Sequence, residues 1–553
     1  MGRRNIFIKL GRKNGQALIL AYMVIVSLSI LSVSLLDKVI SERNLLERQK
    51  LEKEAFYFAE GGVEDAIDQF ISAIANFQIQ PDVSRFPASG SIMSTYAASA
   101  GFPSGAQVAA VVTEAVEGED MRHVTDPDGI EVGVKTYVVN AVCQHPQNNN
   151  ITVSLNQLIT LRVIYTFQHA VFYNDDLEII PGPNMTFTGR IHSNKDMYLD
   201  SENTLTINSE YVHSAGNVYN QRKDTTTPAP GDVRIKKLGT GSYVNMNGMD
   251  SDDPNWITES QNYWKGTVKN SVHGVTKLST PVVGSIQPGG YYSSQAGVTI
   301  ENETISVGGA VLVEGTDMPA DTIETRADFY NNREGKYVSM TYIDLKKMAG
   351  YAPGDSEGHP SFPNRLPSNG LIYATNNESG AMEQPGVMLV NGSQIYSTKG
   401  LTVVSNDPIY IKGDYNTVNK KPTSVICDSV NLLSNSWIDD RSDGSLNDRD
   451  ATATTFNTAF IAGVNNTTTG HYNGGLENYP RLHEDWSGIT LTIKGSFVEL
   501  WNSQIAQGLW IYGSPQYKAP GRSWSYDSDF NVNNMPPFTP WAVEARRGAW
   551  WKE

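Results

Sequence analysis

The chain has 553 residues, and its 59 acidic against 43 basic side chains give a formal net charge of −16. Five of the basic residues precede Gly15 in a segment without acids, so the rest of the chain is more acidic still. A surface that binds nucleic-acid phosphates needs clustered Lys and Arg, and none gather beyond this segment, so the composition excludes nucleic acid as an expected partner.

An uncharged apolar run, Ala17 to Leu36, directly follows the basic leader at 1–15. Its 20 residues are about the length that crosses a bilayer as a helix. A cleaved secretory signal has an apolar core of only about 7–15 residues. Because basic residues beside an apolar helix tend to stay in the cytoplasm, we predict a single-pass inner-membrane anchor embedded over 17–36, with a cytoplasmic amino terminus and an exported remainder.

The helical pattern continues beyond the apolar run. Residues 41–54 are rich in helix formers, and apolar residues then recur at intervals of three and four, as in an amphipathic helix. Gly61 and Gly62 each weaken a helix by about 1 kcal/mol relative to Ala, and Pro81 ends the pattern. We predict one helix over 16–80 whose last third has one face to bury. This face consists of Phe56, Ala59, Glu60, Val63, Ile67 and Phe70.

The same region carries a motif of the form Arg-Gln…Ala-Phe…Ala-Glu-x-Gly. Its residues are Arg48, Gln49, Ala55, Phe56, Ala59, Glu60 and Gly62. With the basic leader and the apolar run, this motif resembles the amino-terminal region of PilX-type type IV pilus assembly proteins over about the first 70 residues. The resemblance implies cleavage by prepilin peptidase after Gly15, which leaves Gln16 as the amino terminus. It also implies that the amphipathic face of the helix is an assembly face, through which the chain associates with other pilin or minor pilin subunits. Major pilins carry Glu as the fifth residue of the processed chain, where this sequence has Leu20, so the resemblance implies a minor subunit.

The exported part is predicted to be mainly β, which makes the fold class α+β: a long helix followed by a large β domain. Residues 129–144 and 151–174 alternate apolar and polar side chains, as half-buried strands do. We therefore predict a pilin-like antiparallel sheet within 81–175, covering the amphipathic part of the helix.

A weak repeat follows this sheet, since Ile191-His192-Ser193 returns as Val212-His213-Ser214. Short strands with Gly or Asn turns continue along the chain, which favours a β-solenoid over 176–434, with an irregular β-sandwich as the alternative. Residues 221–290, rich in Thr, Pro, Gly, Asp and Asn, are predicted to be a loop insertion.

The carboxyl-terminal region, 435–553, is predicted to be rich in loops and in Trp and Tyr. Its aromatic residues are open to two interpretations, a cap on the end of the β-coil or a platform for a sugar or another surface. They include Trp501, Trp510, Trp524, Trp541, Trp550, Trp551, Tyr512, Tyr517 and Tyr526.

Few residues suggest a bound ligand. An acidic loop around Gly444 offers hard oxygen ligands of the kind that calcium prefers, with a solvated loop as the alternative. Its acids are Asp439, Asp440, Asp443, Asp448 and Asp450. His192 and His213 occupy equivalent repeat positions, where structural use is favoured over metal binding. Cys143 and Cys427 allow either one long-range disulfide or two buried thiols. The sequence holds no nucleophile elbow, phosphate-binding loop or spaced Cys/His set, so we predict a non-enzymatic protein with no cofactor beyond candidate calcium.

These features together predict a non-enzymatic minor pilin or type IV pilus assembly subunit. It would be held in inner-membrane lipid, processed by prepilin peptidase and then incorporated into an extracellular filament. Its acidic β head would face outward for adhesion to a surface glycan, a host or an abiotic surface, or for priming assembly. The alternative is a single-pass cell-envelope protein that does not polymerise and whose β domain binds or processes polysaccharide.

Overall fold

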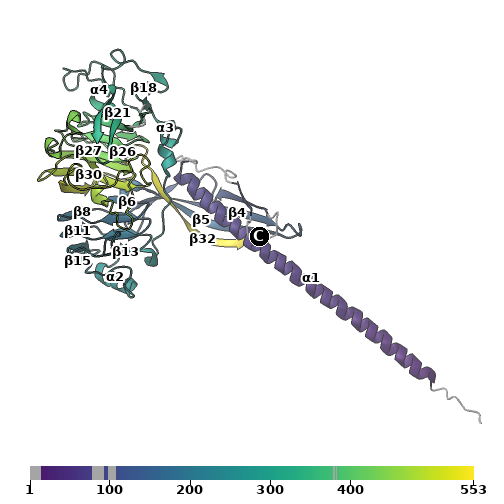
Figure 1. Ribbon diagram of the computed structural model, residues 1–553. Coiled ribbons are helices and arrows are strands. Elements are labelled where there is room, and N and C mark those ends of the chain that lie inside the picture. Colours follow the sequence, from purple (N-terminus) through teal and green to yellow (C-terminus); the bar gives the residue numbers. More distant parts are fainter. Residues whose placement is uncertain (1–13, 78–92, 98–106, 378–379, 381–382) are drawn as a thin grey trace, which may run out of the picture.

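The computed structural model describes residues 14–77, 93–97, 107–377, 380 and 383–553. A single helix, α1 (Asn14–Ala75), leads into a small sheet and then a much larger β head (Figure 1). The predicted class, a long helix followed by a large mainly β domain, is confirmed. Residues 1–13 of the predicted leader lie outside the described part of the chain.

Helix α1 runs for 62 residues without interruption, so the Gly61-Gly62 pair does not break it. Figure 1 shows its first half projecting from the body of the molecule and its second half lying along a sheet. Tertiary packing therefore stabilises the helix where these glycines weaken it.

This small sheet, the stem sheet, has the strand order β1-β2-β4-β5-β32, with β3 also paired to β4, and all its pairs are antiparallel. Its strands are β1 (Met93–Ala97), β2 (Gln107–Glu114), β3 (Arg122–Thr125), β4 (Glu131–Gln144), β5 (Thr152–Tyr165) and β32 (Trp541–Lys552). The predicted strand region 129–144 corresponds to β4, whereas 151–174 is divided between β5 of this sheet and a strand of the head, β6 (Val171–Tyr173).

The closing strand β32 comes from the end of the chain. It pairs with β5 from Trp541 opposite Tyr165 to Lys552 opposite Leu155. The whole head is therefore inserted between two neighbouring strands of the stem sheet. The prediction that 435–553 forms one loop-rich region is wrong for its last 13 residues, because their partner strand lies several hundred residues earlier. It is also wrong for Thr454–Ala462, Thr490–Glu499 and Gly521–Tyr526, which are strands of the head, so the predicted end of the β region at 434 falls too early.

The first part of the head is a parallel β-coil with three strands per turn. One ladder contains β6 (Val171–Tyr173), β9 (Ile191–Ser193), β12 (Val212–Ser214) and β16 (Val268–Lys269). The second contains β7 (Leu177–Ile179), β10 (Met197–Leu199) and β13 (Val218–Tyr219). The third contains β8 (Met185–Thr188), β11 (Thr204–Asn208) and β14 (Asp232–Lys236), with β15 (Tyr243–Asn245) antiparallel at its edge. This parallel stacking is what a solenoid requires, and it differs from the pairing of an antiparallel sandwich.

The repeated tripeptides and the predicted loop insertion both lie within this coil. His192 and His213 are register partners on β9 and β12, so the repeated tripeptides do occupy successive turns. The predicted loop insertion over 221–290 includes β14 and β16, which continue two ladders, and helix α2 (Trp256–Trp264). The prediction that 221–290 is a loop insertion is therefore wrong for these elements. Their strands are short and lie between long turns, so the alternation of apolar and polar residues is hard to recognise in the sequence.

The second part of the head is another parallel β-coil. It begins at the end of the head far from the first coil, and its successive turns approach the first coil. One ladder contains β17 (Val298–Glu301), β22 (Leu371–Thr375), β24 (Leu401–Val404), β26 (Thr423–Cys427), β28 (Thr454–Ala462), β30 (Thr490–Glu499) and β31 (Gly521–Tyr526). The other contains β21 (Lys336–Asp344), β23 (Glu383–Val390), β25 (Ile409–Lys412), β27 (Val430–Leu433) and β29 (Arg481–Leu482). Antiparallel strands β18 (Thr304–Val307), β19 (Ala310–Val311) and β20 (Ile323–Asn331) lie at its far end.

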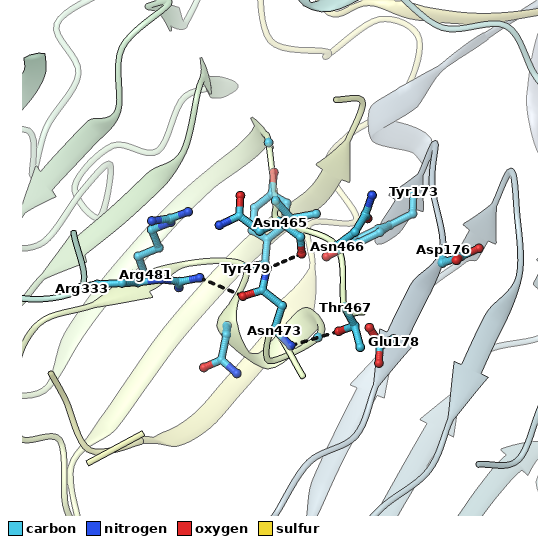
Figure 2. Close-up of a pocket in the computed structure, with 14 residues that line it drawn as sticks. Tyr173, Asp176, Glu178, Arg333, Asn465, Asn466, Thr467, Asn473, Tyr479 and Arg481 are labelled. Atoms are coloured by element: carbon cyan, nitrogen blue, oxygen red, sulfur yellow. Dashed lines mark hydrogen bonds between the residues drawn. The ribbon is translucent and has the colours of Figure 1, made fainter. Parts of the chain in front are cut away.

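The two coils meet at a seam, where β30 pairs in parallel with β6 and Phe497 is opposite Val171. A 13-stranded sheet results, and the chain enters and leaves the head close to this seam. Figure 2 shows a small cavity beside it, with Tyr173 and Glu178 on one side and Arg333 and Arg481 on the other. Its volume of about 30 Å³ leaves room for roughly one water molecule, so it is too small for a substrate.

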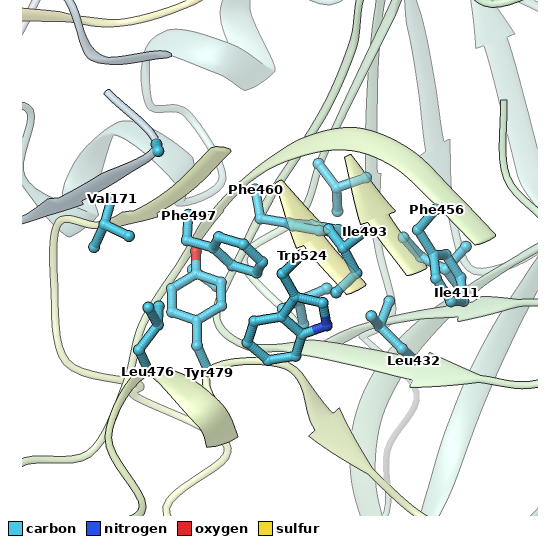
Figure 3. Packing of buried hydrophobic residues seen from close by; sticks show 14 of the residues in the cluster. Val171, Ile411, Leu432, Phe456, Phe460, Leu476, Tyr479, Ile493, Phe497 and Trp524 are labelled. Carbon is cyan, nitrogen blue, oxygen red and sulfur yellow. The ribbon is translucent and has the colours of Figure 1, made fainter. Parts of the chain in front are cut away.

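Aromatic packing fills the interior next to the seam (Figure 3). The rings of Phe497 and Trp524 have centroids 5.1 Å apart, and Tyr479 meets Phe497 edge-on at 5.6 Å. The Tyr479 hydroxyl donates to the backbone carbonyl oxygen of Val498 at 2.7 Å. Because each fully buried ring contributes about 1.5–3 kcal/mol, this cluster joins the two coils into one body.

The two cysteines are free and buried in different parts of the molecule. Cys143 belongs to the core between α1 and the stem sheet, and Cys427 belongs to the core of the head. The disulfide alternative is therefore wrong, because the thiols lie in separate cores. Burial raises the pKa of both thiols, which keeps them protonated and unreactive.

Candidate functional site

The first half of α1 is a bare segment, defined here as residues 15–50, in which every residue is exposed. Large apolar side chains point outward on all sides of it; Leu20 is 65% exposed and Tyr22 is 70% exposed. The helix is long and apolar enough to cross a membrane, and no residue of its most apolar window is buried. Such an extended apolar surface requires lipid or other protein to cover it.

The second half of α1 packs against the chain's own sheet. Four residues of the predicted assembly face, Ala59, Val63, Ile67 and Phe70, are buried in the core with strands β2, β4 and β5. Phe56 is half-buried and Glu60 is exposed. The assignment of the four buried residues to contacts between subunits is therefore corrected, since the stem sheet already covers their side chains.

Gly62 sets how closely the helix approaches the sheet. A Cβ atom at this position would lie 2.4 Å from Cγ1 of Val108 on β2 and 3.5 Å from Cβ of Ala141 on β4. Further along the helix, Phe70 meets Tyr137 of β4 edge-on with ring centroids 4.9 Å apart. Gly62 thus allows close packing of the helix on the sheet, and this packing stabilises the helix where the glycine weakens it.

Polar contacts attach α1 to both ends of the stem sheet. Arg547 on β32 forms an ion pair with Glu64 through both of its terminal guanidinium nitrogens. A carboxylate oxygen of Glu54 lies 3.1 Å from Nε2 of the buried His145 and accepts a hydrogen bond from this nitrogen when it carries a proton. Sequence reasoning missed Arg547, because an arginine 483 residues from its partner carries no local signal.

The predicted processing residues lie at the beginning of α1. Gly15 and Gln16 are in its first turn, and both are exposed. A Cβ atom at Gly15 would have no neighbour within 4 Å. The described part of the chain therefore leaves this position uncovered.

The predicted calcium ligands lie in a loop with two short 3₁₀ turns, Asp439–Arg441 and Leu446–Asp448. Asp439 accepts from Nε1 of Trp437 at 2.8 Å, Asp443 from the hydroxyl of Tyr337 at 3.2 Å, and Asp448 from Oγ of Ser445 at 2.7 Å. Among the residues that the structure describes, no three His, Cys, Asp or Glu side chains gather as a metal site. Asp440 and Asp450 do not complete such a group either. Calcium binding therefore stays a prediction, and the contacts of these acids do not support it.

The predicted aromatic cluster is dispersed. Trp501 and Trp524 are buried in the head, Tyr526 contacts its core, and Trp541, Trp550 and Trp551 lie on β32 in the stem sheet. Trp550 meets Phe56 of α1 at a centroid distance of 5.9 Å. One groove on the head is lined by three residues of the predicted cluster, Trp510, Tyr512 and Tyr517. These nine residues therefore do not form a single cap on the end of the coil.

A column of aromatic rings and histidines lies where the head meets the stem. Phe172 stacks on His192 at 5.1 Å, and Tyr211 lies 3.6 Å from His213. Burial lowers the pKa of His192 to about 4 and that of His169 and His213 well below the usual value. These imidazoles are neutral at physiological pH, which fits the structural use that the repeat positions suggested.

This burial predicts a specific loss of stability in mild acid. The pKa of His192 is lower in the folded chain than in the unfolded chain, so the stability that it contributes is complete above about pH 6.5 and declines as the pH falls toward 4. At pH 5 the loss from this residue is about 2 kcal/mol relative to pH 7. In His192→Gln, the change in the free energy of unfolding between pH 7 and pH 5, measured by chemical denaturation, should be smaller by that amount.

His123, exposed on β3, provides the matched control. The variant His123→Gln should retain the wild-type dependence on pH. An unchanged pH dependence in His192→Gln would show that this imidazole is not held neutral by the fold.

No family model matches this chain, and no curated protein matches it. Among solved structures, the competence-associated pilin ComZ from Thermus thermophilus aligns with 91% of this chain and 97% of its own, at 10% sequence identity and a TM-score of 0.24. A TM-score this low does not establish a shared fold.

Proposed function

We propose that this protein is a minor-pilin-like subunit of a type IV pilus, anchored in the inner membrane by α1 before it enters a filament. The observation that supports this proposal is the division of α1 into two halves. Residues 15–50 are wholly exposed and begin with an apolar run, whereas the half that follows is buried on one side by its own sheet.

The length of the bare segment fits two successive environments. At 1.5 Å per residue, the run 17–36 extends about 30 Å, the thickness of the hydrocarbon core of a bilayer. The charged residues that follow, such as Asp37, Lys38 and Glu42, belong in water or at the membrane surface. Lipid covers the apolar run before assembly, and the helices of neighbouring subunits replace it afterwards.

The absence of an acid at Leu20 favours an accessory position. A carboxylate among apolar helices is stable only when it is paired, and major pilins use one to contact the next amino terminus. Without it, this chain makes one contact fewer in the filament. The large acidic head is then exposed, for adhesion or for priming assembly, and the protein needs no catalytic activity.

The experiment that tests this proposal is the mass of the amino-terminal peptide from cells with and without active prepilin peptidase. The processed chain should begin at Gln16, and both cells without the peptidase and the variant Gly15→Val should retain the full leader. Gly2→Val, within the leader, should be processed like the wild type. An intact leader in wild-type cells with an active peptidase would contradict the proposal and favour an anchored envelope protein that does not polymerise.

A further inference from the structure

A groove of about 400 Å³ lies on the head at the seam between the two coils. The first coil contributes Ile180, Pro183 and Arg222 to its wall, and the region around β29 and the β30–β31 connection contributes Tyr472, Trp510 and Tyr512. Its size falls within the range of small-molecule binding sites, about 300–1,000 Å³. The seam cavity of Figure 2 shares Asn478 with this groove but is far smaller.

Aromatic rings are held rigidly around this groove. Tyr472 meets Trp510 edge-on with centroids 5.4 Å apart, and Nε1 of Trp510 donates to the hydroxyl of Tyr517 at 2.9 Å. Tyr512 stands edge-on to Tyr517 at 5.7 Å and is 56% exposed. Rings fixed in this way offer apolar faces to a ligand at little cost in conformational entropy.

Among the residues that the structure describes, both carboxylate oxygens of Glu477 and Nε of Arg522 are buried without a hydrogen-bond partner, while Nη2 of Arg522 donates to the backbone carbonyl oxygen of Glu477 at 3.3 Å. Glu477 is only 4% exposed, and the backbone N–H groups of Glu477 and Ile180 lie near its carboxylate but outside hydrogen-bond geometry, so neither carboxylate oxygen has a partner among the described residues. Burial raises the pKa of this carboxyl to about 7, against the opposing effect of Arg522 and of the backbone N–H groups of Glu477 and Ile180. The buried Nε of Arg522 also has no acceptor. A buried polar group without a partner destabilises the fold, so a ligand that supplies the missing hydrogen bond binds more tightly for that reason.

The unpaired carboxylate of Glu477 and the unpaired Nε of Arg522 together restrict the charge that a ligand of the groove can carry. An anion would satisfy Arg522 but face the carboxylate of Glu477, and a cation would meet Glu477 but lie beside Arg522 and Arg222. A hydroxyl group both donates and accepts, so neighbouring hydroxyls satisfy both groups. The C–H faces of a pyranose ring also pack on aromatic rings such as Tyr512.

We propose that this groove binds a neutral saccharide, with Tyr512 and Trp510 packing on its rings and Glu477 and Arg522 bonding to its hydroxyls. Its role as the adhesive site of the head depends on the function proposed above, whereas binding itself does not. Loss of binding therefore leaves the processing experiment unaffected, and a failure of processing leaves the binding experiment unaffected.

Titration calorimetry on the full-length chain tests the proposal, in a detergent without a sugar headgroup. The neutral probes are cellotriose, maltotriose and tri-N-acetylchitotriose, with anionic trigalacturonate and the cationic glucosamine trimer as comparators. At least one neutral probe should bind more tightly than both comparators. Tyr512→Ala, at an exposed position, should weaken that binding about tenfold, a change of about 1.4 kcal/mol.

Tyr243→Ala provides the matched control, because Tyr243 is 41% exposed on β15 of the same head but does not line the groove. This variant should bind like the wild type. Three results would overturn the proposal: no binding of any neutral probe at millimolar concentration, equal binding by Tyr512→Ala, or tighter binding of a charged comparator.

Discussion

A chain that ends at Pro540 is expected to lose the docking of α1 on the stem sheet while its head remains folded. This deletion removes β32, which pairs with β5 along its length, and with it the completely buried Ala542 and Val543. The ion pair between Arg547 and Glu64 is lost as well. Each buried apolar side chain contributes about 1.5–3 kcal/mol, and the edge of β5 would be left unpaired, so the stem sheet should unfold.

Limited proteolysis of the detergent-solubilised chain measures this effect. Cleavage should become rapid within 107–165, whereas fragments of the head, 171–540, should persist. A shorter truncation that removes only Lys552 and Glu553 should behave like the full chain, because β32 keeps its buried residues. Equal resistance of the stem sheet in both truncations would contradict the inserted arrangement.

Gly62→Leu is expected to produce the largest effect of any single substitution in α1. Its Cβ atom alone would lie 2.4 Å from Val108, closer than side-chain carbons approach one another, so the helix must move away from β2. Overpacking of a core costs about 1–3 kcal/mol and occasionally more, and the gain of about 1 kcal/mol from replacing a helical Gly does not offset the further bulk of Leu. We expect a loss of about 3 kcal/mol or more in the free energy of unfolding of the stem.

Asp68→Leu is the matched control, because Asp68 is exposed on the same helix. It introduces the same side chain without meeting the sheet and should leave stability nearly unchanged. The two variants can be compared by chemical denaturation, with rapid proteolysis of the stem as a second measure. A Gly62→Leu chain as stable as Asp68→Leu would mean that the helix does not pack on β2 as closely as described.

The parts of the fold that could be predicted from the sequence depend on nearby residues. The apolar run and the three-and-four periodicity lie within one continuous segment, and they predicted a helix over 16–80 where the structure has Asn14–Ala75. The alternation in 129–144 likewise predicted β4. In each case the pattern and the element that it produces occupy the same stretch of chain.

The parts that could not be predicted depend on pairs of residues far apart in the sequence. Nothing near Trp541 indicates that it lies opposite Tyr165, and nothing near Phe497 indicates that it lies opposite Val171. The assembly face was misassigned for the same reason. An amphipathic stripe shows that a face is buried, but it does not show whether the same chain or a neighbouring subunit covers it.

Candidate site residues show the same limit. Tryptophans close in the sequence are distributed over the head core, the stem sheet and the groove, because β31 and β32 run into different sheets. The unmet groups of Glu477 and Arg522 depend on burial by both coils, which composition cannot reveal. Sequence proximity therefore grouped residues that the fold separates.

The central claim is that the bare segment of α1 packs among the helices of other subunits, and photo-crosslinking in purified filaments tests it most directly. A photoreactive benzoylphenylalanine in place of Leu28, which is 55% exposed in this segment, should attach to the amino-terminal helices of other pilin subunits in filaments sheared from cells. The contrary result would be a chain that is absent from the sheared filaments and whose residue 28 reacts with lipid alone.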